Sequence, residues 1–522
     1  MSKSRALMTS MAAVVAGKAA TAVAGLLTIM VLTRQLGPQE FGYYRTVLTY
    51  AAFASVVADL GIYLVGLREM SRPGADASRV IGNALLLRLV STAAVLLAAS
   101  GLALLLPYDN VVKQGIFLGA LIYTAIQGSE FLVAVFQLVT KQAGSALAEA
   151  GGAVVTLLGV WGLSRLDVGV LPMLSATLLG ALATISISWT LAHKLVPFRL
   201  RFEPALWHQY FVAGLPIAGS HILSMAMLRG DTLLLSLLKP AADVGLYGVP
   251  TKMFELATSL PYMFAGLMMP LMTAAAAKAF SSPAAPAVIG PAFASAAAAD
   301  DAASAHATAS VGEVHESAKG NVEFGRLLSR SLDAMLMYGV GVILALAVFA
   351  PQILAFISGP EFAAGALALV ILSFATLFVA LSIVLRFSLI ALDRPRSVLL
   401  ADALSCAIAL VAYFTLIPRF SLVGAATGTA IAEVSVLVFM LWGLRRAGQP
   451  LPRLSSFAKT MLAGVTAAGG IWLLARLHVP WLLAAAAGGG LYLALLALTG
   501  AVPRELLMSF RRRSGVSSAK TL

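Results

Sequence analysis

Several cations stand inside long apolar stretches of this sequence, where a charge is costly and marks a candidate functional residue. They are Lys18, Arg45, Arg229 and Lys252. Arginine offers paired hydrogen-bond donors in a planar fork, and lysine offers a mobile point charge. We therefore predict that these four side chains contact an anionic ligand in a cavity.

Acids stand in the same stretches, and two interpretations of them stay open. They are Asp59, Glu130, Asp231, Glu255 and Glu433. A carboxylate in this setting could bind a proton or a sodium ion, or it could neutralise a cation on a neighbouring helix. Lys252 and Glu255, for example, are spaced as residues i and i+3 of one helix and could pair with each other.

The stretches that carry these charges are long enough to cross a membrane as helices. Hydrophobic residues make up 60% of the 522 residues, charged residues make up only 11%, and the mean hydropathy is +0.92. Because a bilayer core requires ~20 apolar residues in a helix, we predict an all-α polytopic membrane protein. About fourteen transmembrane helices are expected, at 7–33, 41–67, 80–106, 114–139, 143–163, 168–192, 210–238, 244–272, 331–357, 363–391, 397–417, 421–444, 457–477 and 480–501.

The basic residues predict how these helices are oriented. The net charge is +13, but the 36 Lys and Arg residues are spread over short loops, which argues against a nucleic-acid partner. Most of them fall in alternate loops, and the positive-inside rule places those loops in the cytoplasm. We therefore expect both termini to be cytoplasmic and the first apolar stretch to be a retained helix.

One long insert interrupts the apolar pattern. Residues 273–325 are rich in Ala, Ser and Pro, a composition that cannot bury a core and predicts a disordered cytoplasmic loop. The single cysteine, Cys406, can form neither an intramolecular disulfide nor a metal site by itself. The sequence has no P-loop and no His-Glu-x-x-His motif, so we expect transport without a cofactor, a metal or enzymatic activity.

The chain contains an internal repeat. Residues 36–44 read LGPQEFGYY between the first two predicted spans, and residues 238–247 read LKPAADVGLY between the seventh and eighth. With one inserted residue, Leu, Pro, Gly and Tyr match. An even number of spans separates the copies, so they share one orientation, as in transporters built from parallel repeats. Proline should end one helix, and glycine should let the chain turn into the next.

The same segments resemble a known family. The residues RQLGPQEFGYY at 34–44, ADLGI at 58–62 and REMSR at 68–72 are similar to the N-terminal signature of bacterial polysaccharide flippases. These flippases belong to the multidrug/oligosaccharidyl-lipid/polysaccharide exporter superfamily. The residues GDTLLL at 230–235, VGLY at 244–247 and KMFE at 252–255 resemble the start of that family's second half.

The resemblance implies a fold and a function. It implies two pseudo-symmetric six-helix bundles around a central cavity, at 1–203 and 204–444, and then an extra helix pair with a basic cytoplasmic tail at 445–522. The implied function is flipping of an undecaprenyl-diphosphate-linked oligosaccharide to the outer leaflet of the cell inner membrane by alternating access. The product would be a surface polysaccharide such as O-antigen, lipopolysaccharide or exopolysaccharide. The expected partners are this substrate, membrane lipids and polysaccharide polymerase or assembly proteins.

Three alternatives stay open. A drug or cation antiporter of the same fold would favour acids over cations in its cavity. A flippase for the peptidoglycan lipid precursor would share the anionic cargo. A membrane polysaccharide polymerase or ligase would favour a large outer loop, whereas the predicted outer loops are short.

Overall fold

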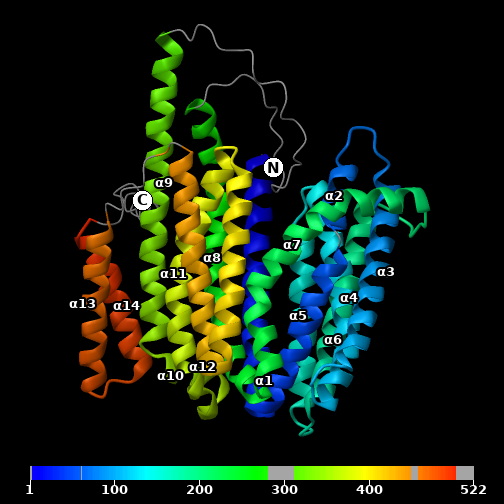
Figure 1. Cartoon of the computed structure of the whole chain (residues 1–522), viewed down its shortest axis with the longest axis horizontal. Helices are drawn as coiled ribbons and strands as arrows, with labels where there is room; N and C mark the ends of the chain where they lie inside the picture. The colour runs from blue at the N-terminus through cyan, green and yellow to red at the C-terminus, as the bar shows by residue number, and fades with distance from the viewer. Residues whose placement is uncertain (1–2, 60, 280–310, 448, 450–455, 501–522) are drawn as a thin grey trace, which may run out of the picture. The chain divides into compact units, whose positions relative to one another are not determined.

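The structure is a computed structural model that describes residues 3–59, 61–279, 311–447, 449 and 456–500 (Figure 1). Every regular element in these residues is helical: α1 (Lys3–Asp59), α2 (Ile62–Met70), α3 (Ala77–Ala103), α4 (Asn110–Leu138), α5 (Ala143–Leu163), α6 (Val170–Leu195), α7 (Pro204–Leu238), α8 (Ala241–Ala279), α9 (Val311–Ala347), α10 (Ala350–Ser358), η1 (Pro360–Gly365), α11 (Ala366–Ala391), α12 (Pro395–Arg446), α13 (Phe457–Arg476) and α14 (Trp481–Leu498). Within the described chain, 11 helices are long and apolar enough to cross a membrane. The prediction of an all-α polytopic protein is confirmed.

Two of these helices continue through predicted loops: α1 joins the predicted span 7–33 to most of the span 41–67, whose end lies in α2, and α12 joins the spans 397–417 and 421–444. α1 bends at Gly37 (φ 65°, ψ −179°), directly before Pro38. α12 bends at Ser421 (φ 49°, ψ −125°), just after Pro418. A Cβ atom at Gly443 would lie 3.4 Å from Ser397 Cβ, so the two halves of α12 run back beside each other (Figure 1).

The glycines that match between the repeats do not make these turns, contrary to our expectation. Gly42 and Gly245 lie inside helices, where each admits the backbone of the other copy. A Cβ atom at Gly42 would lie 1.8 Å from the Ala241 carbonyl oxygen, and one at Gly245 would lie 1.9 Å from the Pro38 carbonyl oxygen. The two repeat segments therefore pack against each other reciprocally. We call this the glycine contact.

The chain divides into two compact units. Unit 1 consists of Met1–Thr251, Leu354–Gly365 and Ala409–Gly428. In it α1 packs against α3, α4, α5 and α7. An apolar core lies between α2, α3 and α4 and includes Ile81, Leu85, Phe131 and Phe136, none of which is exposed.

Unit 2 consists of Lys252–Ile353, Ala366–Ile408 and Thr429–Leu522. In it α9 packs against α11, and the last helices α13 and α14 pack against each other and against α9 (Figure 1). The buried Tyr492 of α14 donates its hydroxyl hydrogen to the Met337 carbonyl at 2.8 Å. This hydrogen bond fixes the C-terminal helix pair to α9.

The segment between α6 and α7 is tied to the start of α3. A Cβ atom at Gly82 would lie 2.0 Å from the Arg199 carbonyl oxygen, so only glycine allows this approach. Glu203 accepts hydrogen bonds from Arg79 Nε at 3.0 Å and from Asn83 Nδ2 at 3.1 Å. The hydrogen bond from Arg79 is the main reason that the pKa of Glu203 is lowered to about 2.

The predicted loop at 273–325 is helical at both edges, since α8 continues to Ala279 and α9 begins at Val311. Apolar and helix-forming residues continue past the predicted span ends on both sides. Residues 280–310, the centre of this predicted loop, lie outside the described residues.

Candidate functional site

The cation in the first half of α1 is paired with an acid of α5. Lys18 Nζ lies 2.5 Å from Glu149 Oε2, and the two side chains are 53% and 32% exposed. Such an open ion pair contributes only ~0–1 kcal/mol to stability. The ammonium group is therefore accessible to a ligand that could replace the carboxylate.

The cation in the second half of α1 lies where α8 passes closely. Arg45 Nη2 donates to Thr251 Oγ1 at 3.2 Å. Gly248 permits this approach, because a Cβ atom there would lie 3.0 Å from both Arg45 Cγ and Phe41 Cε1. The half-buried guanidinium of Arg45 is thus fixed at a contact between the two repeats.

Asp231 connects α7 to α8. Its side chain is buried, and Oδ2 accepts a 2.6 Å hydrogen bond from the hydroxyl of Tyr247. Oδ1 accepts a 2.5 Å hydrogen bond from the backbone N–H of Thr232. Arg229 lies two residues earlier on α7 and is half-buried. The tyrosine of the second repeat motif therefore orients the predicted acid.

Lys252 and Glu255 lie on one helix face in unit 2. Lys252 Nζ is 3.2 Å from Glu255 Oε2, and the side chains are 32% and 23% exposed. This is the i, i+3 pairing that one interpretation of the sequence allowed. It partly neutralises Lys252 without enclosing it.

The most enclosed charge cluster lies between α1, α3 and α4. The Arg88 side chain is 3% exposed; its Nη1 pairs with Asp59 Oδ1, and its Nη2 donates to Gln127 Oε1 at 2.6 Å. Glu130 Oε2 is 3.4 Å from the same Arg88 Nη2, but the Glu130 side chain is 58% exposed. Asp59 is therefore held by a buried arginine, whereas Glu130 stays at the open edge of the cluster.

A second arginine–carboxylate pair lies in unit 2. Arg386 and Asp402 form a two-pronged contact, with Nη1–Oδ2 at 2.5 Å and Nη2–Oδ1 at 2.7 Å. Glu433 is half-buried on the other half of α12.

Unit 1 brings some of the predicted residues together and separates others. Arg45 and Asp231 meet neighbouring residues of α8, since Thr251 contacts the first and Tyr247 the second. Lys18 lies instead on the other half of α1, beside α5. The sequence had not indicated Thr251 as the partner of Arg45, because a threonine in an apolar helix is common and gives no signal.

Gln127 and Thr251 are site neighbours that sequence reasoning missed. The signal for Gln127 was present, because an amide inside an apolar stretch requires a buried partner. Among the described residues, no group of three or more His, Cys, Asp or Glu side chains could hold a metal ion. The cations and their acids stay predicted ligand-binding groups.

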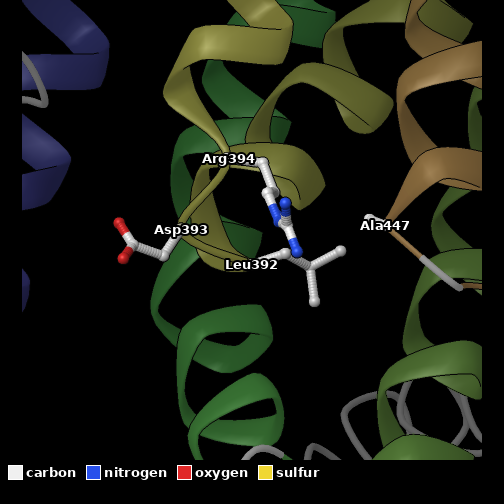
Figure 2. A pocket seen from close by; sticks show the side chains of 4 residues that line it. All are labelled: Leu392, Asp393, Arg394 and Ala447. Atoms are coloured by element: carbon white, nitrogen blue, oxygen red, sulfur yellow. The ribbon is translucent and has the colours of Figure 1, made fainter. Parts of the chain in front are cut away.

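A small open pocket lies in unit 2 at the turn between α11 and α12. It is lined by Leu392, Asp393, Arg394 and Ala447 (Figure 2). None of these residues was among the predicted site residues, since all lie in predicted loop positions.

The fold resembles that of solved membrane transporters. A structure of the lipid II flippase MurJ, in an inward closed conformation, aligns with a TM-score of 0.72 at 12% identity, covering 95% of this chain and 99% of that one. An inward-facing multidrug resistance MATE family transporter of the MOP superfamily aligns with a TM-score of 0.56 at 13% identity, covering 82% and 94%. A Vibrio cholerae MATE transporter, VcmN, aligns with a TM-score of 0.51 at 14% identity, covering 84% and 96%. At these identities the similarity shows the fold alone.

Comparison by sequence gives the family. No curated protein matches significantly. The model of a family described as polysaccharide biosynthesis protein matches residues 7–275, more than half of the chain and both repeat motifs. This match confirms the resemblance to a polysaccharide biosynthesis family, and the solved structures show a shared fold. The chain belongs to the polysaccharide biosynthesis protein family of polytopic membrane proteins.

Proposed function

We propose that this protein flips an undecaprenyl-diphosphate-linked oligosaccharide from the inner to the outer leaflet of the cell inner membrane. The match of residues 7–275 to the polysaccharide biosynthesis family carries the proposal. The fold shared with a lipid II flippase supports it, because both cargoes would be lipid-borne sugars. In this proposal both termini are cytoplasmic and polysaccharide polymerase or assembly proteins receive the product.

The accessible cations suit such a cargo. A lipid diphosphate carries negative charge that must leave the hydrated headgroup region, and fixed cations can replace the lost hydration. Lys18 and Lys252 keep 53% and 32% of their side chains exposed despite their acidic neighbours. We propose that these lysines, with Arg45 and Arg229, contact the diphosphate while bundles 1–203 and 204–444 rock about a cavity. The helix pair at 445–522 would stand outside this core.

The test is the position of the lipid-linked oligosaccharide in cells. Cells lacking the gene would receive the intact gene, Lys18→Gln, or Arg165→Gln as a matched control. Arg165 is exposed and lies against Trp161, outside the proposed site. Labelled oligosaccharide units reached by a membrane-impermeant lectin would then be counted.

In cells lacking the gene, we expect oligosaccharide units to be stranded on the inner leaflet. The intact gene and Arg165→Gln should restore their transport, whereas Lys18→Gln should restore it poorly. Normal units outside with altered chain length would refute the proposal in favour of a polymerase or ligase. If the peptidoglycan lipid precursor is stranded on the inner leaflet instead, the protein is a flippase for that precursor. Because the fold is also that of a MATE transporter, a drug or cation antiporter is the second candidate. Drug sensitivity of cells lacking the gene, without stranded oligosaccharide units, would favour the antiporter.

Ion coupling is a separate part of the proposal. The candidate acids are Asp59, Glu130, Asp231, Glu255 and Glu433. The Glu130 side chain is 58% exposed, compared with 7% for Asp59 and 23% for Glu255. If Glu130 binds the coupling ion, Glu130→Gln should abolish the dependence of flipping on the proton or sodium gradient. Unchanged dependence in this variant would remove Glu130 from the candidates.

A further inference from the structure

Four arginines gather at one end of unit 2. Arg394 and Arg396 stand at the beginning of α12, and Arg445 and Arg446 stand at its end. The bend at Ser421 brings these ends together. The close approach of Gly443, whose Cβ atom would lie 3.2 Å from Leu389 Cδ1, also places the end of α12 beside the end of α11.

The small pocket opens beside the start of α12, and Arg394 is the cluster arginine among its lining residues. Figure 2 shows the Arg394 and Leu392 side chains on the side that faces Ala447, whereas the Asp393 carboxylate points to the opposite side of the turn. The pocket therefore has one cationic wall and one apolar wall. Asp393 also lines the pocket, with its carboxylate on the opposite side of the turn from Arg394.

Three of these guanidinium groups are available to a ligand. The side chains of Arg394, Arg396 and Arg445 are exposed, and they form no ion pair or side-chain hydrogen bond with any described residue. By contrast, Arg34 donates from Nη2 to the Phe356 carbonyl at 2.5 Å. The cluster is thus not neutralised by the fold, and this favours binding of an external anion.

The position of the cluster indicates a membrane surface. It lies where the apolar stretches Pro360–Ala391 and Pro395–Arg446 end. Trp442 stacks under Arg446, with the guanidinium carbon 3.9 Å from the ring centroid, and tryptophan is enriched at the level of lipid headgroups. On the same helix, Leu399 lies one turn after Arg396 and Val438 lies two turns before Arg445, and they expose 53% and 54% of their surface to acyl chains.

We propose that this cluster is a binding site for the phosphate headgroup of an anionic phospholipid. Arg394 would donate to the phosphate at the pocket, Arg396 and Arg445 would add charge around it, and the acyl chains would lie beside Leu399 and Val438. Basic pockets between transmembrane helices are known to suit such headgroups. The inference does not depend on the proposed flipping activity.

The test uses purified full-length protein in neutral detergent and native mass spectrometry of bound lipid. Phosphatidylglycerol is the probe, and phosphatidylcholine of the same acyl chains is the neutral comparison. The site variant is Arg394→Gln, Arg396→Gln and Arg445→Gln together. The control variant is Lys194→Gln, Arg199→Gln and Arg201→Gln, which removes the same charge from exposed residues of unit 1.

We expect the site variant to bind phosphatidylglycerol roughly a hundredfold more weakly, at about fivefold per arginine, with the control close to wild type. Melting temperatures of both variants report whether they are folded, and Arg394→Gln alone serves if the triple variant is not. Equal loss in both variants would overturn the proposal, because general charge would then explain binding. Unchanged phosphatidylglycerol binding with lost binding of undecaprenyl diphosphate would assign the site to the lipid-linked substrate. Displacement of the lipid by millimolar inorganic phosphate would show a site for free phosphate.

Discussion

Substituting Gly42 by alanine should open the glycine contact. The added Cβ atom would lie 1.8 Å from the Ala241 carbonyl oxygen, whereas ordinary contacts begin at 3.4 Å. The two backbones must therefore separate by more than ~1 Å, and overpacking of this kind costs ~1–3 kcal/mol. At ~1.4 kcal/mol for each tenfold change, the ratio of closed to open contact should fall by about 5- to 150-fold.

A buried cysteine can report on this opening. Cys406 would first be replaced by alanine, and Val244, which is 0% exposed beside Gly245, would be replaced by cysteine. We expect Val244→Cys to react slowly with a maleimide when residue 42 is glycine and much faster in Gly42→Ala. Gly25→Ala is the control on the same helix, because nothing lies within 4 Å of a Cβ atom there.

The pseudo-symmetry sharpens the prediction. Gly245→Ala should have a similar effect, since its Cβ atom would lie 1.9 Å from the Pro38 carbonyl oxygen. If Gly42→Ala leaves both the maleimide reaction and the melting temperature unchanged, the close packing of the two repeats is refuted. A lower melting temperature without faster labelling would mean that the strain unfolds the chain instead of opening the contact.

Three further perturbations test the charge and hydrogen-bond networks, each by thermal unfolding in detergent. Arg88→Met should destabilise the fold by about 3–5 kcal/mol, because it removes the buried arginine that pairs with the buried Asp59 carboxylate, and an effect below ~1 kcal/mol would contradict the buried pair. The pKa of Glu203 is lowered from 4.5 to about 2, so the ionised Glu203 stabilises the fold fully above pH 4.5, and this contribution is lost as the pH falls toward 2. Arg79→Gln should remove most of this pH dependence of the melting temperature. An unaltered pH profile in Arg79→Gln would argue against the Arg79–Glu203 pair. Tyr247→Phe should cost ~1.5–3 kcal/mol through the hydrogen bond lost by Asp231, and adding Asp231→Asn should recover part of it; additive losses would show that the two residues act independently.

The positions of the helices could be predicted from sequence, because hydropathy measures the property that a bilayer selects. The sequence also predicted breaks between spans where α1 bends at Gly37 and α12 bends at Ser421. It did not show that the helices continue through these breaks without an intervening loop. The repeat motif identified Gly42 and Gly245 correctly as special residues. Their role was predicted wrongly, because spacing along a chain does not say which backbone approaches a glycine from another helix.

The partners of the charged residues were predictable only in part. Lys252 and Glu255 pair as their spacing on one helix allowed. For Asp59 the sequence offered several cations, and only the packing of α1 against α3 selects Arg88. The arginine cluster of unit 2 was missed because its members are far apart in sequence, at 394–396 and 445–446, and looked like ordinary loop charges.

The bend at Gly37 shows that the two repeat copies have ceased to be interchangeable. Gly37 has a backbone conformation (φ 65°, ψ −179°) that is essentially restricted to glycine. The aligned residue in the second copy is Lys239, whose backbone is extended (φ −136°, ψ 161°) and whose Nζ donates to the Pro418 carbonyl at 2.8 Å. The first hairpin thus requires glycine at this position, whereas the second has a side-chain anchor there. A chimaera that carries the second hairpin in the first position would inherit a residue that its new backbone cannot accept, whereas the reverse exchange would lose only one hydrogen bond.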